Sequence, residues 1–192
     1  MNICVYGAAS TKIDEKYIKA VEELGRKIAE RGHNLVFGAG GSGLMGAAAR
    51  GVHEKGGRVT GVIPTFFLEQ DVEIVFPECD EVIYTRDMRD RKEKMEELAD
   101  AFVTVPGGIG TFEEFYEILT AKQLGRHVKP IALFDIDGYY DKLQEMMEHS
   151  IETKFINEEC RVLYTLYTDA DEMLDAIEND NGPGYEMEQL KK

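Results

Sequence analysis

Short apolar segments alternate with amphipathic helical patterns along most of the 192-residue chain. The apolar segments are nearly continuous Val, Ile, Leu and Phe runs, which is typical of strands covered on both faces. One helical pattern, at 14–31, repeats apolar residues at Tyr17, Val21, Leu24 and Ile28. Strands that alternate with helices form a parallel sheet with right-handed crossovers. The sequence therefore predicts a single-domain α/β fold, a Rossmann-like doubly wound parallel sheet of about seven strands.

The expected elements extend to residue 179 of the chain. We predict strands at residues 2–6, 34–37, 58–63, 81–84, 101–105, 130–134 and 162–167. We predict helices at residues 14–31, 44–54, 87–99, 112–124, 139–153 and 170–179. From Asp180 the sequence turns polar, with Gly and Pro close together. We assign residues 1–179 to one domain that binds a nucleoside monophosphate, and residues 180–192 to a polar tail or an arm against a partner subunit.

The charge of the chain limits its partners. There are 37 acidic and 22 basic residues, a formal net charge of −15. Nucleic-acid backbones and acidic membranes attract basic faces, so we expect neither as a partner. The apolar runs, such as 131–134, are far shorter than the roughly 20 residues of a membrane helix. A single phosphate remains a suitable ligand, because a local group of backbone amides holds an anion on an acidic protein.

The cysteines and histidines indicate neither disulfides nor metal. Three cysteines, Cys4, Cys79 and Cys160, are odd in number and widely spaced. The first residues lack the basic and long apolar parts of a secretory signal, so we expect a cytoplasmic protein. The four histidines show no H-x-H or H-E-x-x-H spacing. We expect no metal and no cofactor.

The first glycine-rich loop follows the second strand, at residues 38–46, and contains G-x-G-x-x-G twice. Glycines let a ligand approach backbone amides, and the following helix start attracts an anion. A dinucleotide site also needs an acid at the end of the next strand, where residues 62–65 read Val-Ile-Pro-Thr. Three interpretations stay open: a dinucleotide site, an anion site involving Ser42, or a tight turn without a ligand.

The second glycine-rich loop, at residues 105–114, also joins an apolar strand to a helix. It is no Walker A loop, because Gly-Lys-Ser/Thr is missing. The amides from Gly108 to Thr111 and the Thr111 hydroxyl are suited to one phosphate. The Thr111-x-x-Glu114 spacing is also that of a capping box, in which Glu114 has only a structural role.

A stripe of basic residues precedes this loop, at residues 88–95. Met88, Arg91, Lys92 and Met95 fall at i, i+3, i+4 and i+7, on one helical face. A mixed-charge helix is ordinarily a solvated face. The methionines instead favour burial of this face, which would carry Arg91 towards the strand ends, where a guanidinium suits a phosphate or a developing charge.

The segments together resemble the LOG family of cytokinin-activating phosphoribohydrolases, often labelled "possible lysine decarboxylase". The family signature P-G-G-x-G-T-x-x-E is intact at 106–114, and its partner M-x-x-R-K-x-x-M is intact at 88–95. Further segments that are similar to the family lie at 40–46, 123–130 and 137–140. The likeness runs through nearly the whole chain, and the joint match is more specific than any one piece.

The resemblance implies a Rossmann-like homodimer that cleaves nucleoside 5′-monophosphates, AMP or a cytokinin riboside 5′-monophosphate, to a free base and ribose 5-phosphate. It assigns Arg91 and Glu114 as the catalytic pair. In this hypothesis Glu114 stabilises an oxocarbenium-like ribose or deprotonates the attacking water, and Arg91 orients the substrate. The expected substrate contacts are Ser42, Gly43, Met45, Glu73, Met88, Lys92, Gly107, Gly108, Ile109, Gly110, Thr111, Glu113 and Thr120.

The sequence departs from the family pattern at three places. Arg89 stands where the family often has His, the family's Trp is missing from 120–122, and 7–10 reads Gly-Ala-Ala-Ser in place of the commoner Cys-Gly-Ser. The last two lie near the expected base pocket, so adenine is the better supported base.

Other classes of function remain to be compared. A carrier of a phosphorylated cofactor, like the similar molybdenum-cofactor carrier proteins, is the main alternative, and a dimeric scaffold is a weaker one. A carrier does not need both Arg91 and Glu114. Lysine decarboxylation normally needs a Schiff-base lysine, whereas Lys92 and Lys94 lie in a charged helix without a cofactor motif.

Overall fold

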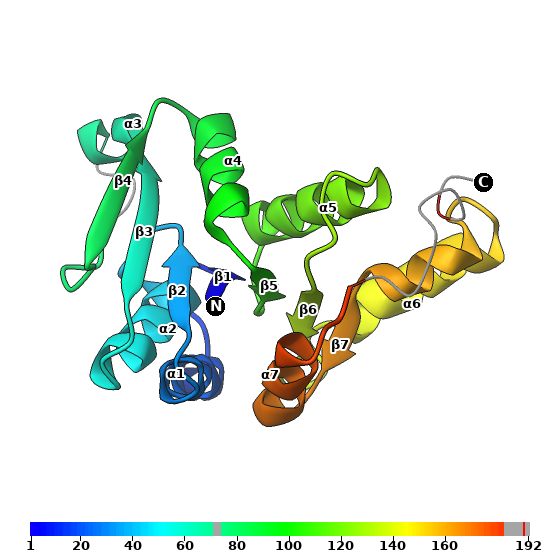
Figure 1. The fold of residues 1–192 in the computed structure, drawn as a ribbon, viewed down its shortest axis with the longest axis horizontal. Helices are drawn as coiled ribbons and strands as arrows, with labels where there is room; N and C mark the ends of the chain where they lie inside the picture. The colour runs from blue at the N-terminus through cyan, green and yellow to red at the C-terminus, as the bar shows by residue number, and fades with distance from the viewer. Residues whose placement is uncertain (71–73, 183–189, 191–192) are drawn as a thin grey trace.

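The computed structural model describes residues 1–70, 74–182 and 190. In this part of the chain seven parallel strands form one sheet in the order β4-β3-β2-β1-β5-β6-β7 (Figure 1). The strands are β1 Asn2–Tyr6, β2 Asn34–Phe37, β3 Val59–Pro64, β4 Glu81–Thr85, β5 Ala101–Thr104, β6 Ile131–Phe134 and β7 Thr165–Tyr167. The predicted α/β Rossmann-like fold is confirmed.

Helices cover both faces of the sheet. One face carries α1 Glu15–Glu30, α2 Gly43–Glu54 and α7 Ala170–Glu178, and the other carries α4 Met88–Leu98, α5 Ile109–Gln123 and α6 Asp141–Glu152 (Figure 1). Strand residues alternate between the two cores: Ile3 and Val5 pack with the first group, whereas Cys4 and Tyr6 pack with the second. This double burial explains why the strands are continuously apolar.

Three details differ from the predicted elements. Val162 and Leu163 belong to a 3-10 helix, η1 Glu158–Leu163, and β7 begins only at Thr165. The short helix α3 Thr65–Glu69 follows β3 and has no buried residue, so it left no apolar periodicity to detect. Helix α5 begins at Ile109 rather than 112, because the glycine segment itself forms its first turn.

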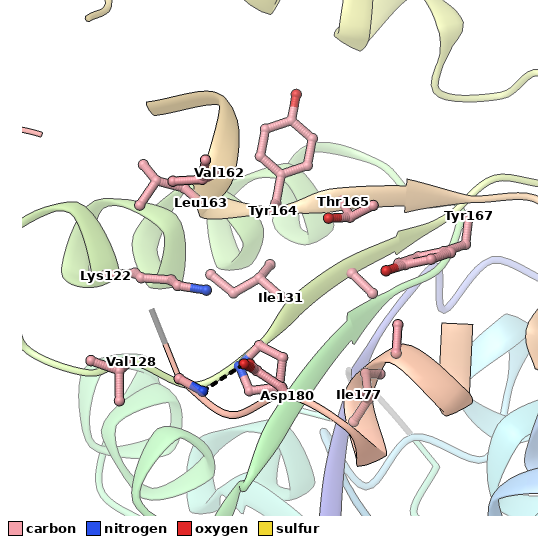
Figure 2. A pocket seen from close by; sticks show the side chains of 14 residues that line it. Lys122, Val128, Ile131, Val162, Leu163, Tyr164, Thr165, Tyr167, Ile177 and Asp180 are labelled. Atoms are coloured by element: carbon pink, nitrogen blue, oxygen red, sulfur yellow. Dashed lines mark hydrogen bonds between the residues drawn. The ribbon is translucent and has the colours of Figure 1, made fainter. Parts of the chain in front are cut away.

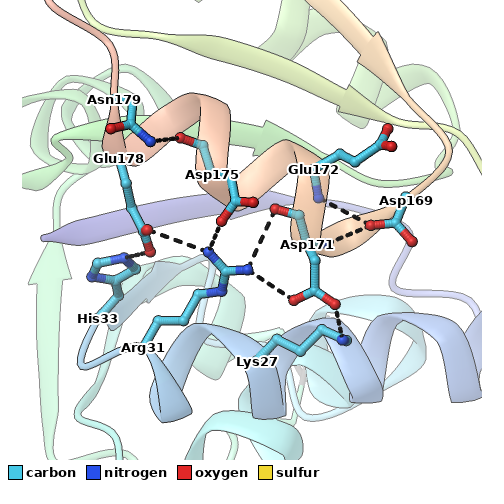
Figure 3. A network of polar contacts seen from close by, with 9 residues as sticks. All are labelled: Lys27, Arg31, His33, Asp169, Asp171, Glu172, Asp175, Glu178 and Asn179. Atoms are coloured by element: carbon cyan, nitrogen blue, oxygen red, sulfur yellow. Dashed lines mark hydrogen bonds and ion pairs between the residues drawn. The ribbon is translucent and has the colours of Figure 1, made fainter.

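The C-terminal helix α7 is held to α1 by charged side chains (Figure 3). Arg31, directly after α1, pairs with Asp171 at 2.9 Å and with Glu178 at 3.3 Å. Lys27 also pairs with Asp171, and the Nε2 atom of His33 lies 2.8 Å from Glu178. Beyond α7, Leu190 is buried in the core on the α5 side. The predicted tail otherwise falls mainly on residues outside the described ones.

We expect this network to show in the acid stability of the protein. The ion pairs with Lys27 and Arg31 lower the pKa of Asp171 below its ordinary value. A lowered folded-state pKa contributes stability above the unfolded value of about 3.9, and this contribution is lost as the pH falls through the folded value. Asp171→Asn should therefore flatten the acid side of the curve of unfolding free energy against pH.

Denaturant titrations between about pH 2 and pH 6 measure this slope. Glu172→Gln, which changes an exposed acid of the same helix, is the matched control. An Asp171→Asn curve that is parallel to the wild-type curve would contradict the prediction.

Candidate active site

The site lies where the strand order reverses, between β1 and β5. In doubly wound sheets the loops beyond the carboxyl ends of the strands diverge at this point and leave a crevice. The loop after β5 enters α5, and the loop after β1 lies beside it, since the Ala8 amide donates to the Pro106 carbonyl at 3.1 Å. The topology therefore brings the second glycine-rich loop to the usual ligand position of this fold.

The second glycine-rich loop ends in an exposed helix start. Gly108, Ile109 and Gly110 are exposed, and the amides of the first helical turn have no acceptor within the helix. The Tyr139 hydroxyl donates to the Gly107 carbonyl, and the Tyr140 hydroxyl donates to the Val105 carbonyl at 2.7 Å. The two tyrosines thus hold the loop, and the first residues of α5 are exposed, an arrangement that suits one anion.

The capping-box interpretation of Glu114 is wrong. The N-cap of α5 is Gly108, which offers no side chain, and Thr111 is the third residue of the helix rather than its cap. The Thr111 side chain packs on Gly107, where a Cβ atom would overlap it. Glu114 therefore lies one turn inside the helix, and the capping role that its spacing indicated is excluded.

The first glycine-rich loop is used for packing. The Ala8 carbonyl accepts from the amides of Leu44 at 2.7 Å and Met45 at 3.4 Å, the first turn of α2. Gly43 has φ +59°, and a Cβ there would collide with the backbone at Ala8. Gly43 and Met45 are buried, whereas Ser42 at the N-cap is half-buried and makes no side-chain cap bond.

Arg91 is buried at the ends of β2 and β3. It is 4% exposed, its Nε donates to the Val62 carbonyl at 3.1 Å, and its Nη2 donates to the Gly38 carbonyl at 3.3 Å. A Cβ atom at Gly38 would overlap the guanidinium, so this position requires glycine. Met95 beside it is fully buried. The predicted inward orientation of the Met88–Met95 stripe is confirmed.

Glu114 faces this guanidinium from α5. Its Oε1 atom lies 3.8 Å from the Nη1 atom of Arg91, and the residue is 8% exposed. Tyr6 of β1 lies on the same side of the sheet; burial raises its pKa well above the ordinary value, and the charges of Cys4 and Glu114 act in the same direction. The tyrosine therefore stays protonated beside Glu114, and the Glu114 carboxyl and the guanidinium share a site of low dielectric.

Lys92 and Glu113 form a second pair nearer the surface. The Lys92 ammonium pairs with Glu113, and it lies 2.7 Å from the Glu117 carboxylate. Met88 approaches the site through its Sδ atom, 3.7 Å from the Nη1 atom of Arg91. Helices α4 and α5 are therefore joined by three ion pairs, the buried Arg91–Glu114 pair and the two pairs of Lys92 nearer the surface.

Not every predicted substrate contact falls in this cluster. Arg91, Lys92, Glu113 and Glu114 come together beside the second loop. Thr120 is exposed and lies nine residues beyond Thr111, roughly 13 Å along the helix axis. Glu73 lies outside the described residues.

The sequence analysis missed the groups that hold the site in place. These are the carbonyls of Gly38 and Val62 and the hydroxyls of Tyr139 and Tyr140. The side-chain pattern does not predict which backbone carbonyls will accept hydrogen bonds. The tyrosines lay in a segment similar to the family, 137–140, which was the available signal.

Within residues 1–70, 74–182 and 190, no group of three or more His, Cys, Asp or Glu side chains is placed to hold a metal ion. In the same part of the chain, none of the helices has the length and apolar character needed to span a bilayer.

Comparison with known proteins places the chain in a family. The family model described as "Possible lysine decarboxylase" matches residues 45–177. Cytokinin riboside 5′-monophosphate phosphoribohydrolase LOG5 of Arabidopsis thaliana is 37% identical over 176 residues, which are 92% of this chain and 76% of that protein. The enzyme named LOG in Oryza sativa subsp. japonica is 37% identical over 185 residues, 96% of this chain and 75% of that protein.

Solved structures are similar in fold. A structural genomics target is 26% identical with a TM-score of 0.70, covering 93% of this chain and 99% of that chain. The molybdenum cofactor carrier protein of Chlamydomonas reinhardtii is 23% identical with a TM-score of 0.69, covering 100% of this chain and 98% of that chain, a likeness of fold alone. The family match and the identity to the plant enzymes go further: this chain belongs to the LOG family, the "possible lysine decarboxylase" family of the matching model.

Proposed function

We propose that the protein hydrolyses the N-glycosidic bond of nucleoside 5′-monophosphates and releases the base and ribose 5-phosphate. The observation that carries this proposal is the buried Arg91–Glu114 pair, 3.8 Å apart, beside an exposed helix start. The relatives' names state this activity on cytokinin riboside 5′-monophosphates. AMP is the substrate that we expect this chain to accept most readily, given its departures at 7–10 and 120–122.

In the proposed mechanism the phosphate binds first. The amides from Gly108 to Thr111 hold the 5′-phosphate at the positive end of α5, with Ser42 as a further donor. A phosphate fixed in this way orients the attached ribose, so that the reaction proceeds from one geometry. The exposure of Gly108, Ile109 and Gly110 supports this role, whereas the amides of Leu44 and Met45 already donate to Ala8.

The bond then breaks with positive charge on the ribose. Glu114 stabilises that charge or removes a proton from the attacking water, as carboxylates do in related glycoside chemistry. Arg91 offsets the negative charge of Glu114 at this buried position. Two backbone carbonyls hold Arg91, so no rearrangement of its side chain is needed during the reaction.

A direct assay tests the proposal. Purified protein is incubated with AMP and, separately, with a cytokinin riboside 5′-monophosphate. Chromatography then measures the free base and the ribose 5-phosphate, which we expect in equal amounts. Base release without ribose 5-phosphate, or no release from any nucleoside monophosphate in a panel, would overturn the proposal. The carrier alternative predicts retention of an intact ligand under the same conditions.

Removal of the substrate phosphate tests the amide site separately. We expect adenosine to be cleaved with a kcat/KM about 10- to 100-fold below that of AMP, because charge-assisted hydrogen bonds contribute about 1.5–3 kcal/mol. Adenosine and AMP are compared at equal enzyme concentration, with inorganic phosphate added to adenosine as a control. Equal kcat/KM values for the two substrates would remove the amides of α5 from the mechanism.

The lysine decarboxylase label is poorly supported by the lysines of the signature helix. Lys92 pairs with Glu113 and Glu117, and Lys94 pairs with Glu97 at 3.0 Å. Burial lowers the pKa of Lys92, but its pairs with Glu113 and Glu117 raise it above the ordinary value, whereas a Schiff base forms from a neutral amine. An absorbance spectrum of the purified protein with added pyridoxal phosphate tests the label, and the band of an internal aldimine would revive it.

We also propose that the protein acts as a homodimer, as its resemblance to the family implies. Light scattering coupled to size-exclusion chromatography should give about twice the chain mass of 21.6 kDa. A mass that equals that of one chain across the working concentration range would contradict this.

A further inference from the structure

A second cavity lies at the opposite end of α5 from the glycine-rich loop (Figure 2). Its volume is about 320 Å³, within the range of small-molecule sites. The walls come from the end of α5, the starts of β6 and β7, η1 and the end of α7, and they are largely apolar, including Ile131, Leu163 and Ile177. The proposed mechanism makes no use of this cavity.

One cation enters this apolar space. Lys122 is 6% exposed, and Figure 2 shows its side chain directed into the cavity. Within the described residues its ammonium group makes no hydrogen bond or ion pair. Burial lowers the pKa of Lys122, and the charge of Asp180 acts in the opposite direction without direct contact. A buried ammonium in an apolar wall is costly unless an anion accompanies it.

The carboxylate at the margin of the cavity does not meet this need. Asp180 is exposed, and its carboxylate accepts from the Gly182 amide at 2.8 Å, a contact drawn in Figure 2. Water solvates an exposed carboxylate, so Asp180 gains little from a bound cation. Lys122, which is nearly removed from water, gains more from a bound anion. The charge that complements the cavity is therefore negative.

We propose that this cavity is a second ligand site, which takes a small monocarboxylate with an apolar body. The ligand's carboxylate pairs with the Lys122 ammonium, and its hydrocarbon part packs against Ile131, Leu163 and Ile177. Burial of the hydrocarbon and pairing of the buried cation both favour binding. The site is separate from the Arg91–Glu114 pair and does not depend on the proposed function.

Titration with hexanoate tests this site, with hexan-1-ol and hexylamine as ligands of the same apolar body. Binding is followed by calorimetry and by amide chemical shifts, which should move around Lys122 and Ile131. We expect hexanoate to bind the wild-type protein, and both Lys122→Met and the cavity-filling Ala176→Trp to weaken it about tenfold or more. Lys142→Met, which removes an exposed lysine of α6, is the matched control and should bind as the wild type does.

Each contrary result is decisive. If Lys122→Met bound hexanoate as tightly as the wild type does, the lysine would have no part in the site. The same conclusion would follow if the wild type bound hexan-1-ol and hexanoate with equal affinity. Tighter binding of hexylamine would show that Asp180 sets the selectivity instead. No hexanoate binding by the folded wild type at about 10 mM would overturn the site itself. Base release from AMP, measured on the same samples, reports on the other site independently.

Discussion

Glu114→Gln should lower kcat for base release from AMP by about 10²- to 10⁴-fold, the usual range for loss of a positioned acid or base. The amide keeps the size of the side chain and its place beside Arg91. It has no negative charge to stabilise an oxocarbenium-like ribose and cannot accept a proton from water. Because the chemistry rather than phosphate binding is changed, we expect KM to change much less than kcat.

The comparison needs a control for the loss of one carboxylate. Glu145→Gln removes an exposed acid of α6 that pairs with Lys142, and it should retain wild-type turnover. Circular dichroism and thermal unfolding establish that each variant is folded. Wild-type turnover by folded Glu114→Gln would end the proposed role of this residue.

Arg91→Lys should lower kcat by about 10²- to 10³-fold, comparable to the loss of a preorganised electrostatic donor. The guanidinium contacts the carbonyls of Val62 and Gly38 while its third nitrogen faces Glu114. An ammonium keeps the charge but lacks the planar fork that reaches all three positions. The substitution therefore separates the charge of residue 91 from its geometry.

Two further variants measure how much the position of the Arg91 guanidinium contributes to kcat. Arg89→Lys changes an exposed arginine of the same helix and should leave kcat unchanged. Gly38→Ala keeps the arginine, but its methyl group would overlap the guanidinium and displace it from this position, so it should lower kcat in the same direction as Arg91→Lys. If folded Arg91→Lys and Gly38→Ala both turned over AMP like the wild type, the held guanidinium would have no part in the reaction.

The two proposals concern opposite ends of one helix. The first turn of α5 offers its amides to a phosphate, and Lys122 near its last turn enters the second cavity. The expected ligands differ in kind, a nucleoside monophosphate at one end and an apolar carboxylate at the other. Variants at each end can therefore be assayed on the same protein without confusing the two sites.

Local sequence determined which segments form strands and helices and which face of α4 is buried. Continuous apolar runs favour covered strands, and the spacing of Met88, Arg91 and Met95 has the period of one helical face. These properties depend on neighbours within a few residues, so the order of residues is enough to predict them. The signature segments at 88–95 and 106–114 indicated Arg91 and Glu114 only through the resemblance to the family.

Only the tertiary structure distinguished the two glycine-rich loops. Both patterns indicate anion sites, yet the amides of Leu44 and Met45 donate to Ala8, whereas Gly108, Ile109 and Gly110 are exposed residues. Likewise, Arg91 is held by carbonyls 29 and 53 residues away. Whether an amide is available, or a guanidinium is fixed, depends on groups brought close by the strand order. Backbone carbonyls are present at every residue, so no sequence pattern marks the ones that will be used.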